Sequence, residues 1–343
     1  MNRSILLIYT GGTIGMKQDA ASLALVPFNF NQILEEVPEL KKFGYNIDTL
    51  SFDPPIDSSD VEPVFWVNLS GIIKRNYDKY DGFVILHGTD TMSYSASAMS
   101  FMLQNLEKPV VFTGSQLPIG MLRTDGKENL ISAIEIAAAV DSDGHPIVPE
   151  VSLYFESELY RGNRTTKYNA ENFRAFRSVN YPVLANVGIH IKFNNSVIHY
   201  PITWGNTLNI RTEVDTNVVI IKIFPGLQQG VFKRMITTPG IRAVVLETFG
   251  SGNAPTKQWF LDIVKETVDR GVAVINVTQC HAGSVDMDAY ATGIALKRVG
   301  VVSGYDITTE AAITKLFFLL GQYPDNENVI NGFIRDISGE ISI

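Results

Sequence analysis

The sequence holds a single cysteine in 343 residues, and it contains no long apolar run. Cys280 has no second cysteine to pair with, so an internal disulfide is excluded and nothing points to an oxidising compartment. No apolar window reaches the ~18 residues that a membrane-spanning helix needs, and the N-terminal apolar run is too short for a signal peptide. We therefore expect a cytoplasmic protein with no membrane partner.

Clusters of basic residues and metal-binding motifs are missing as well. The net charge is −8, and the longest runs of lysine and arginine are pairs such as Lys41-Lys42, which argues against a nucleic-acid partner. The five histidines are scattered and no His-Glu-x-x-His motif is present. The sequence therefore gives little support for a metal site.

What the chain does contain is an alternation of strand-like and helix-like segments, which indicates a parallel sheet covered on both faces. We expect an α/β fold with a larger N-terminal domain over residues 1–195, a linker over 196–216 and a smaller C-terminal α/β domain over 217–343. The expected strands cover residues 5–9, 46–52, 83–86, 110–112, 151–155, 218–224, 243–248 and 272–277, and the expected helices cover 29–42, 92–105, 127–140, 256–270 and 309–320.

The chain is organised around the stretch from Ile5 to Gly15. An uncharged apolar run is typical of a strand buried on both faces, and Gly11-Gly12 then turn the chain sharply before Thr13. Ligands of open α/β sheets bind beyond the carboxyl ends of the strands, so Thr13 is the first candidate for chemistry. The stretch could also be a plain glycine-rich turn. A dinucleotide-binding fingerprint is disfavoured, because Thr10 stands where the first glycine of G-x-G-x-x-G belongs.

Polar residues also end two further strands. His87-Gly88-Thr89-Asp90-Thr91 follows the strand at 83–86, and Thr113-Gly114-Ser115-Gln116 follows the strand at 110–112. A rim of small hydroxyl and acidic residues suits a small polar ligand better than a phosphate or a flat cofactor. Asp90 or Thr91 could instead simply cap the helix that follows.

Two other segments leave alternatives open. Asp57-Ser58-Ser59-Asp60 leads into a helix, and Ser59 with Glu62 fits a capping box, although two hydroxyls at a helix N-terminus could also hold a carboxylate. The basic stretch from Tyr160 to Lys167 is either a solvated face or part of the crevice at the strand ends.

Together these motifs resemble those of the L-asparaginases, in particular the bacterial cytoplasmic type I enzymes. The resemblance extends over essentially the whole chain. It rests on residues 10–15, 57–60, 87–91, 113–116, 164–167, 250–255 and 276–280. It implies hydrolysis of the side-chain amide of L-asparagine to L-aspartate and ammonia, without a cofactor or a metal.

The resemblance also implies roles for the matching residues. Thr13 would be the nucleophile that forms a β-aspartyl ester, and Thr89, Asp90 and Lys167 would form a second triad that activates water or relays protons. In some accounts of the family the two threonines exchange roles. The residue types fit the chemistry, because a threonine hydroxyl needs a base to take its proton, and a lysine can be that base when burial lowers its pKa.

The substrate-binding residues implied by the resemblance are Asp57, Ser58, Ser59, Gly88, Ser115 and Asn253. Ser58 would bind the α-carboxylate at the helix N-terminus, and Asp90 would also hold the α-ammonium. Members of the family form homotetramers built as dimers of dimers. Asn253 would then reach the substrate of a neighbouring subunit.

Two positions depart from the family pattern. Leu25 stands where many relatives carry a loop tyrosine, so we expect Tyr290 to supply the hydroxyl that helps to deprotonate Thr13; the alternative is a core or interface tyrosine. Glu247 stands where some relatives carry an arginine of an allosteric asparagine site, beside the cysteine that matches Cys280. Because a glutamate would repel a carboxylate, we expect this allosteric control to be weakened or absent. Cys280, a remnant of that site, is expected to be a buried small apolar residue.

Other functions remain as alternatives. A broader amidohydrolase that accepts glutamine is the nearest, because one methylene changes binding by only ~1–3 kcal/mol. The asparaginase-like subunit of an archaeal tRNA-dependent amidotransferase carries an extra N-terminal domain that we do not expect here. A binding protein that senses asparagine would not need the nucleophile, and a nicotinamide oxidoreductase is disfavoured by the missing fingerprint.

Overall fold

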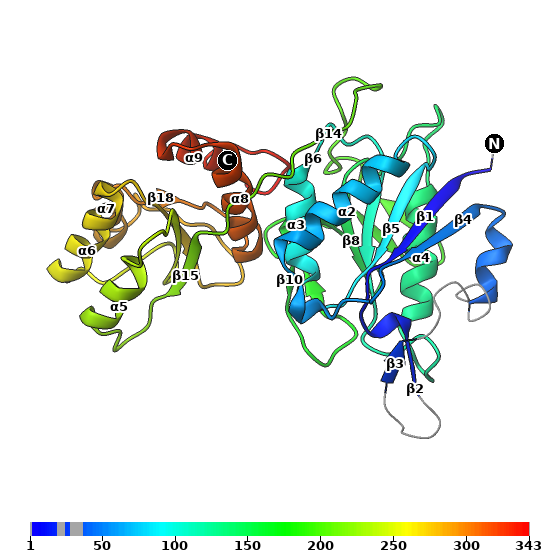
Figure 1. The fold of residues 1–343 in the computed structure, drawn as a ribbon, viewed down its shortest axis with the longest axis horizontal. Coiled ribbons are helices and arrows are strands. Elements are labelled where there is room, and N and C mark those ends of the chain that lie inside the picture. The colour runs from blue at the N-terminus through cyan, green and yellow to red at the C-terminus, as the bar shows by residue number, and fades with distance from the viewer. Residues whose placement is uncertain (1, 19–24, 28–36, 343) are drawn as a thin grey trace. The chain divides into compact units, whose positions relative to one another are not determined.

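Two sheets of mainly parallel strands organise the chain, one in Met1–Arg211 and one in Thr212–Ile343 (Figure 1). The computed structural model describes residues 2–18, 25–27 and 37–342. The α/β fold class expected from the sequence is confirmed. The division after Arg211 falls inside 196–216, where we expected a linker, and the domain bounds themselves stay a prediction.

The large sheet of the first unit has the strand order β13-β12-β9-β8-β7-β5-β1-β4. Its parallel strands are β1 (Ser4–Tyr9), β4 (Asn46–Ser51), β5 (Gly82–Leu86), β7 (Val110–Thr113) and β8 (Val151–Phe155), and β9 (Glu158–Arg161), β12 (Ala185–Val187) and β13 (Ile191–Phe193) extend it antiparallel. The central strands are buried on both faces, as their apolar sequences predict.

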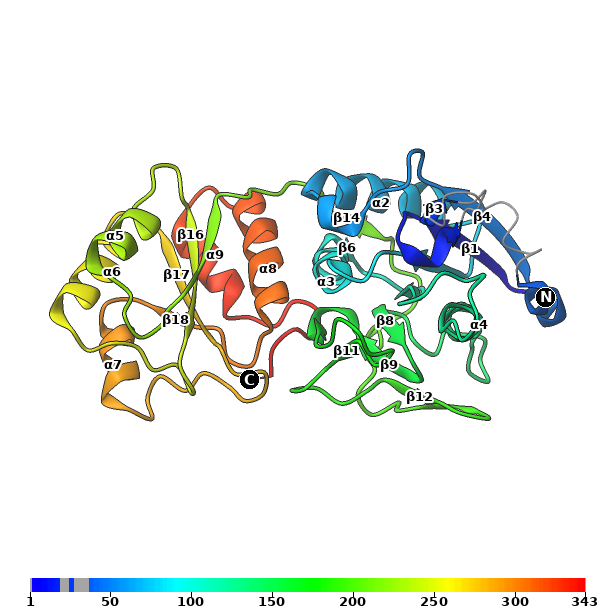
Figure 2. The ribbon, with the colours of Figure 1, turned by 90° about the horizontal axis from the view of Figure 1, so that it is seen from below.

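Helices cover both faces of this sheet (Figure 2). Helix α4 (Gly126–Ala138) packs Leu130 and Ile134 into one core cluster with Ile5, Leu7 and Val84. Side chains alternate across a strand, so the residues between these face the other side, where α2 (Pro63–Asn76) and α3 (Met92–Met102) lie against each other.

The order of the parallel strands reverses next to β1. The chain passes from β1 to β4 on one side, and the next strand of the sheet, β5, lies on the other side of β1. Such a topological switch point opens a crevice beyond the strand ends, since the two connections leave in opposite directions. It lies between the loops that carry Thr13 and Thr89.

The second unit has a four-stranded parallel sheet in sequence order, β15 (Val218–Lys222), β16 (Ala243–Thr248), β17 (Ala273–Thr278) and β18 (Val302–Ser303). Helices α5 (Gln229–Ile236), α6 (Gln258–Asp269) and α7 (Ala291–Arg298) contribute Phe232, Phe260 and Leu296 to its core cluster. Helices α8 (Thr309–Gln322) and α9 (Asn326–Phe333) pack against each other and against the same sheet.

Short elements account for the remaining segments and correct several expectations. They are η1 (Thr13–Gly15), η3 (Pro38–Phe43), η4 (Ser58–Asp60), η5 (Gly162–Arg164), β2 (Met16–Gln18), β3 (Leu25–Pro27), β6 (Leu103–Gln104), β10 (Thr166–Lys167), β11 (Phe176–Arg177) and β14 (Asn209–Ile210). The helix expected over 29–42 begins outside the described residues, and its described end is the 3-10 helix η3. The helix expected to reach residue 105 ends at Met102, because β6 pairs with β14.

No helix in the described part of the chain combines the length and the apolar character that crossing a bilayer requires.

Candidate active site

Close contact between backbones joins the turn after β1 to the turn after β5. Gly11 and Gly12 have φ values of 141° and 87°, which favour glycine. A Cβ on Gly12 would lie 2.6 Å from the Cα of Gly88, and a Cβ on Gly88 would lie 2.4 Å from Oγ of Ser58. Any side chain at either glycine would separate these loops. The glycines therefore bring Thr13, Thr89 and Ser58 to one place at the switch point.

Lys167 joins the second threonine to its neighbouring aspartate. Its Nζ donates to Oγ1 of Thr89 at 2.9 Å and to Oδ1 of Asp90 at 2.6 Å. Lys167 belongs to β10, which pairs with β11, so its position depends on a part of the chain far from β5. The predicted trio of Thr89, Asp90 and Lys167 is thus assembled as a hydrogen-bonded group. Through this lysine the basic stretch 160–167 reaches the loop after β5.

Thr13 begins η1 and is half-buried. Its position follows from the contact between Gly12 and Gly88, each of which directly precedes one of the two threonines. In the part of the chain that the structure describes, no hydrogen bond leaves the backbone N–H of Thr13 or of Thr89. Two N–H groups in neighbouring loops are thus available to an oxygen of a ligand.

Tyr9 lies beneath the first turn. Its ring would be 2.2 Å from a Cβ on Gly15, and its hydroxyl donates to the carbonyl of Gly12 at 3.3 Å. Burial raises the pKa of Tyr9 to about 12, so the phenol stays protonated near neutral pH and offers no phenolate to accept a proton. Tyr9 therefore supports the turn rather than serving as a base for Thr13.

The loop before α2 is held by hydrogen bonds that differ from the expected capping box. Asp57 caps η4, because its Oδ1 accepts from the N–H of Ser59 at 2.9 Å and from its hydroxyl at 2.8 Å. The N–H and then the hydroxyl of Ser59 lower the pKa of Asp57. Helix α2 has Glu62 at its N-cap and no side-chain cap, so the expected box of Ser59 and Glu62 is wrong.

Ser58 itself is buried, and the loop is tied to the turn after β5. The hydroxyl of Thr91 donates to the carbonyl of Ser58 at 2.6 Å. Thr91 occupies the N-cap position of α3 but makes no side-chain cap bond there. The hydroxyl that was considered as a cap therefore links two loops of the site.

Gln116 is a site residue that sequence reasoning missed. The hydroxyl of Thr89 donates to Oε1 of Gln116 at 3.5 Å, and Nε2 of Gln116 donates to the carbonyls of Ala170 and Asn172. Asp125 accepts the N–H of Gln116 at 2.9 Å and fixes its backbone. The one signal in the sequence that could have identified Gln116 was its position directly after Ser115, at the end of a strand.

Ser115 is buried, and its hydroxyl donates to the carbonyl of Leu117 at 2.6 Å. Its proton is therefore used inside its own loop, and its oxygen remains available as an acceptor. Asp125 holds the same loop. Burial raises the pKa of Asp125, although its hydrogen bonds from the N–H groups of Gln116 and Leu117 act to lower it.

Asn253, Tyr290 and Cys280 belong to the second unit. The hydroxyl of Thr292 donates to Oδ1 of Asn253 at 2.5 Å, and this bond does not use the two N–H donors of the Asn253 side chain. Tyr290 is the N-cap residue of α7, and its side chain is 59% exposed. Cys280 is exposed, so the expectation of a buried residue is wrong; it lies in the loop that follows β17.

Glu247 is held by groups of its own unit. Its Oε1 accepts from the hydroxyl of Thr309 at 2.7 Å, at the first turn of α8, and its Oε2 lies 3.9 Å from Nζ of Lys222. A carboxylate is favoured at a helix N-terminus, because the N–H groups there are unpaired. Glu247 thus has a structural role of its own.

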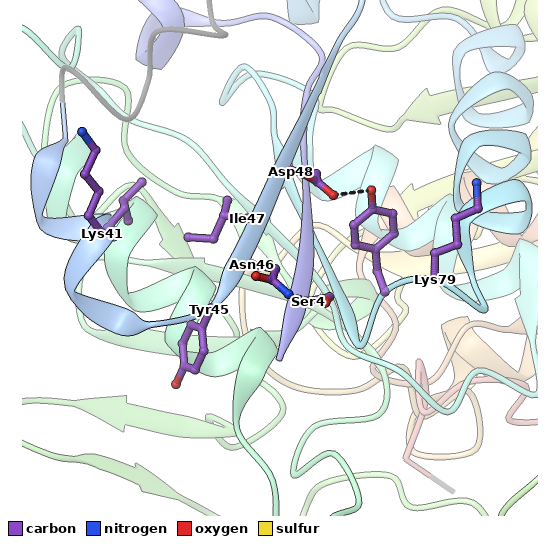
Figure 3. A pocket seen from close by; sticks show the side chains of 9 residues that line it. Ser4, Lys41, Tyr45, Asn46, Ile47, Asp48 and Lys79 are labelled. Atoms are coloured by element: carbon purple, nitrogen blue, oxygen red, sulfur yellow. Dashed lines mark hydrogen bonds between the residues drawn. The ribbon is translucent and has the colours of Figure 1, made fainter. Parts of the chain in front are cut away.

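Two other places in the described part of the chain have features of a ligand site, an acidic cluster and a surface hollow. Among the described residues, Asp141, Asp143 and His145 carry potential metal-ligating atoms within 4.8 Å of one another, but the two aspartates are exposed and Asp141 accepts the N–H of Asp143 and of His145. A hollow of about 560 Å³ lies along the edge strand β4 (Figure 3). Its Lys41 and Lys79 lie on either side of the strand and do not converge.

Comparisons with known proteins match both units. The family model described as "Asparaginase, N-terminal" matches residues 4–199, and "Glutaminase/Asparaginase C-terminal domain" matches residues 217–333. The chain is 43% identical over 342 residues to L-asparaginase 1 of Escherichia coli K12, covering 99% of this chain and 98% of that protein. It is 38% identical over 365 residues to a 60 kDa lysophospholipase of Mus musculus, covering 99% of this chain and 63% of that protein. The crystal structure of L-asparaginase I from Vibrio cholerae matches with a TM-score of 0.90 at 40% identity, with both chains covered completely.

Proposed function

The chain belongs to the asparaginase family, and from this premise we propose how its residues hydrolyse L-asparagine to L-aspartate and ammonia. The activity as an L-asparaginase follows from the family and the relatives. One observation supports the assignment of residues above the others. Nζ of Lys167 contacts both Thr89 and Asp90, in loops next to the Thr13 turn.

We assign Thr13 as the nucleophile. Its hydroxyl oxygen attacks the side-chain amide carbon, its proton passes to the amide nitrogen, and ammonia leaves as the β-aspartyl ester forms. Water then attacks the ester, activated by Thr89 and Lys167 with Asp90 orienting the ammonium, and aspartate leaves as the Thr13 hydroxyl is restored. The N–H groups of Thr13 and Thr89 suit the oxyanion of both steps, and one such donor is worth ~3–4 kcal/mol.

Substrate binding follows from the charges of the loops. Among the described residues, neither the N–H nor the hydroxyl of Ser58 donates to another protein group, so Ser58 suits the α-carboxylate, and the exposed carboxylate of Asp90 suits the α-ammonium. Asp57 and Ser59 hold that turn through their mutual hydrogen bonds. Gly88 and Ser115 line the site with a backbone group and an acceptor oxygen.

We propose that the site is completed by a neighbouring subunit in a homotetramer made as a dimer of dimers, in the cytoplasm. Asn253 would supply its amide donors, which Thr292 orients. Tyr290 lies two residues from Thr292 and would then act from the same subunit, passing the proton of Thr13. Sedimentation at micromolar concentration tests this assembly, and an active monomer would contradict it.

We also propose that Glu247 weakens or removes allosteric control by asparagine beside Cys280. Asparagine saturation curves should be hyperbolic in wild type and in Cys280→Ala. Sigmoidal kinetics that the Cys280 substitution abolishes would contradict the proposal.

Ammonia release tests the function directly. Wild type should release ammonia from asparagine faster than from glutamine, and Thr13→Ala should release it from neither. A glutamine rate equal to the asparagine rate would favour the broader amidohydrolase, and binding without turnover in wild type would favour a sensor. A further assay measures fatty-acid release from a lysophospholipid. We expect no release, because the residues of the proposed site carry hydroxyl and charged groups.

A further inference from the structure

A chain of buried hydrogen bonds runs behind the turn after β5. Nε1 of Trp66 in α2 donates to Oγ of Ser95 in α3 at 3.0 Å, and Oγ of Ser95 lies 2.9 Å from Nε2 of His87. Nδ1 of His87 lies 2.7 Å from the carbonyl oxygen of Gly88. We call Trp66, Ser95 and His87 the buried chain. It links the helices on one face of the sheet to the residue before Thr89.

The direction of each hydrogen bond is fixed by chemistry. An indole N–H can only donate and a carbonyl can only accept, so every hydrogen bond of the buried chain donates in the direction from Trp66 to Gly88. His87 therefore donates from Nδ1 to Gly88 and accepts at Nε2 from the hydroxyl of Ser95. Burial among Phe65 and Phe112 lowers the pKa of His87 to about 4, so the imidazole is neutral at pH 7. Bonds aligned in one sense strengthen one another.

The last bond of the buried chain ends on a peptide group that matters for chemistry. The carbonyl of Gly88 and the N–H of Thr89 belong to one peptide, which is planar and trans, so they point in opposite directions. Holding the carbonyl against His87 aims the N–H of Thr89 away from the buried side. That N–H has no partner among the described residues.

We propose that His87 is a positioning residue, which aims and polarises the N–H of Thr89 as an oxyanion donor through the carbonyl of Gly88, with Ser95 and Trp66 holding its ring. This rests on the proposed hydrolysis of asparagine. Its effect belongs to the transition state, because the oxyanion develops there, and so it acts on kcat more than on KM.

Two substitutions at His87 separate positioning from packing. His87→Asn places an amide donor near the position of Nδ1, whereas His87→Leu fills the apolar surroundings but offers no donor. A packing role predicts that the leucine variant is at least as stable and as active as the asparagine variant. Positioning predicts opposite orders: His87→Leu has the higher Tm, but His87→Asn has the higher kcat.

The expected sizes follow from the strength of one hydrogen bond. We expect kcat of His87→Leu to fall roughly tenfold with KM for asparagine within about twofold, and His87→Asn to recover most of that loss. Equal kcat in wild type and His87→Leu, or leucine above asparagine in kcat, would overturn the proposal. An inactive wild type would instead overturn the proposed function.

Ser95 gives a second test should the His87 variants fail to fold. Ser95→Ala breaks the buried chain one bond further from the site, so we expect a loss in kcat of roughly two- to fourfold at unchanged KM. Ser97→Ala is the matched control, because Ser97 is also buried in α3 but its hydroxyl donates to Ser93 within the helix. Equal kcat in the two alanine variants would contradict the role of Ser95.

Discussion

Each unit of the chain holds a lysine paired with a carboxylate, and the two pairs differ in their access to water. The side chains of Lys167 and Asp90 in the first unit are 21% and 62% exposed, whereas those of Lys315 and Glu340 in the second unit are both 0% exposed. Nζ of Lys315 also donates to the carbonyls of Phe333 and Arg335. Burial separates the two pairs: the open pair is accessible to a ligand, as the proposed proton transfer requires, and the sealed pair holds the C-terminal segment in place.

The sheets around the two pairs explain this difference. The strand order of the first sheet reverses between β1 and β5, and ligands of open α/β sheets bind beyond the strand ends at such a reversal. The parallel strands β15 to β18 follow one another without reversal, and the Lys315 pair lies where α8 meets the end of the chain. A parallel sheet alone does not make a site.

Removing the open lysine is expected to have the largest effect. Lys167→Met should lower kcat by roughly 10³-fold, within the range known for proton-transfer groups, with little change in the free energy of unfolding. Ammonia release and urea denaturation measure the two quantities. Lys297→Met, which removes an exposed lysine paired with Asp288, is the control. A kcat of Lys167→Met within tenfold of the wild-type value would contradict a catalytic role for the open pair.

Removing the sealed lysine should show the reverse pattern. Lys315→Met leaves Glu340 buried without its counter-charge, and we expect it to lower the free energy of unfolding by ~3–5 kcal/mol. The kcat of the folded protein should change by less than about twofold. Lys315→Met combined with Glu340→Leu should restore much of the stability, and no recovery would argue against an electrostatic cause.

Acid stability tests a sealed group in the first unit. Because burial lowers the pKa of His87 to about 4, the unfolded chain binds a proton below pH ~6.5 that the folded chain does not. The stability that depends on neutral His87 is complete above this pH and is lost as the pH falls towards 4. Wild type should lose roughly 2–4 kcal/mol more than His87→Leu over this window, as measured by urea unfolding. Parallel curves for the two proteins would contradict the sealed environment.

An exposed pair should matter least for stability. Lys265 and Asp269 are one helical turn apart in α6, with side chains 58% and 59% exposed. Lys265→Met should change the free energy of unfolding by no more than ~0.5 kcal/mol, because water and salt screen the pair. A loss similar to that of Lys315→Met would mean that burial does not separate the pairs.

The strand ends show what the sequence could predict. Thr13, Thr89 and Asp90 follow buried strands and were found by that rule, since parallel strands present their carboxyl ends at one edge. The pattern offered the basic stretch 160–167 with two alternatives, and the choice of Lys167 came from the resemblance, because its place depends on β10 pairing with β11, which local pattern does not reveal. Its hydrogen bonds to Thr89 and Asp90 join distant parts of the chain, so they could not be predicted from local sequence.

Other features were hidden for physical reasons. The buried chain was missed because Trp66 and Ser95 lie in segments whose pattern predicts only a helix, and because His87 was counted among the polar residues at a strand end. Helices α5, α7 and α9 have eight residues each, too few turns to establish a helical period. Cys280 was expected inside because cysteines usually are, but the loop after β17 leaves it exposed.

The contact between Gly12 and Gly88 also limits how this protein can be redesigned. Main chains already touch there, so this part of the proposed site has no side chain to trim and no room to add one. A version accepting a longer amide would have to gain space at side chains near Thr89, for instance by shortening Gln116, which accepts a hydrogen bond from Thr89. Directed evolution would then find its useful changes around such side chains and almost none among the glycines.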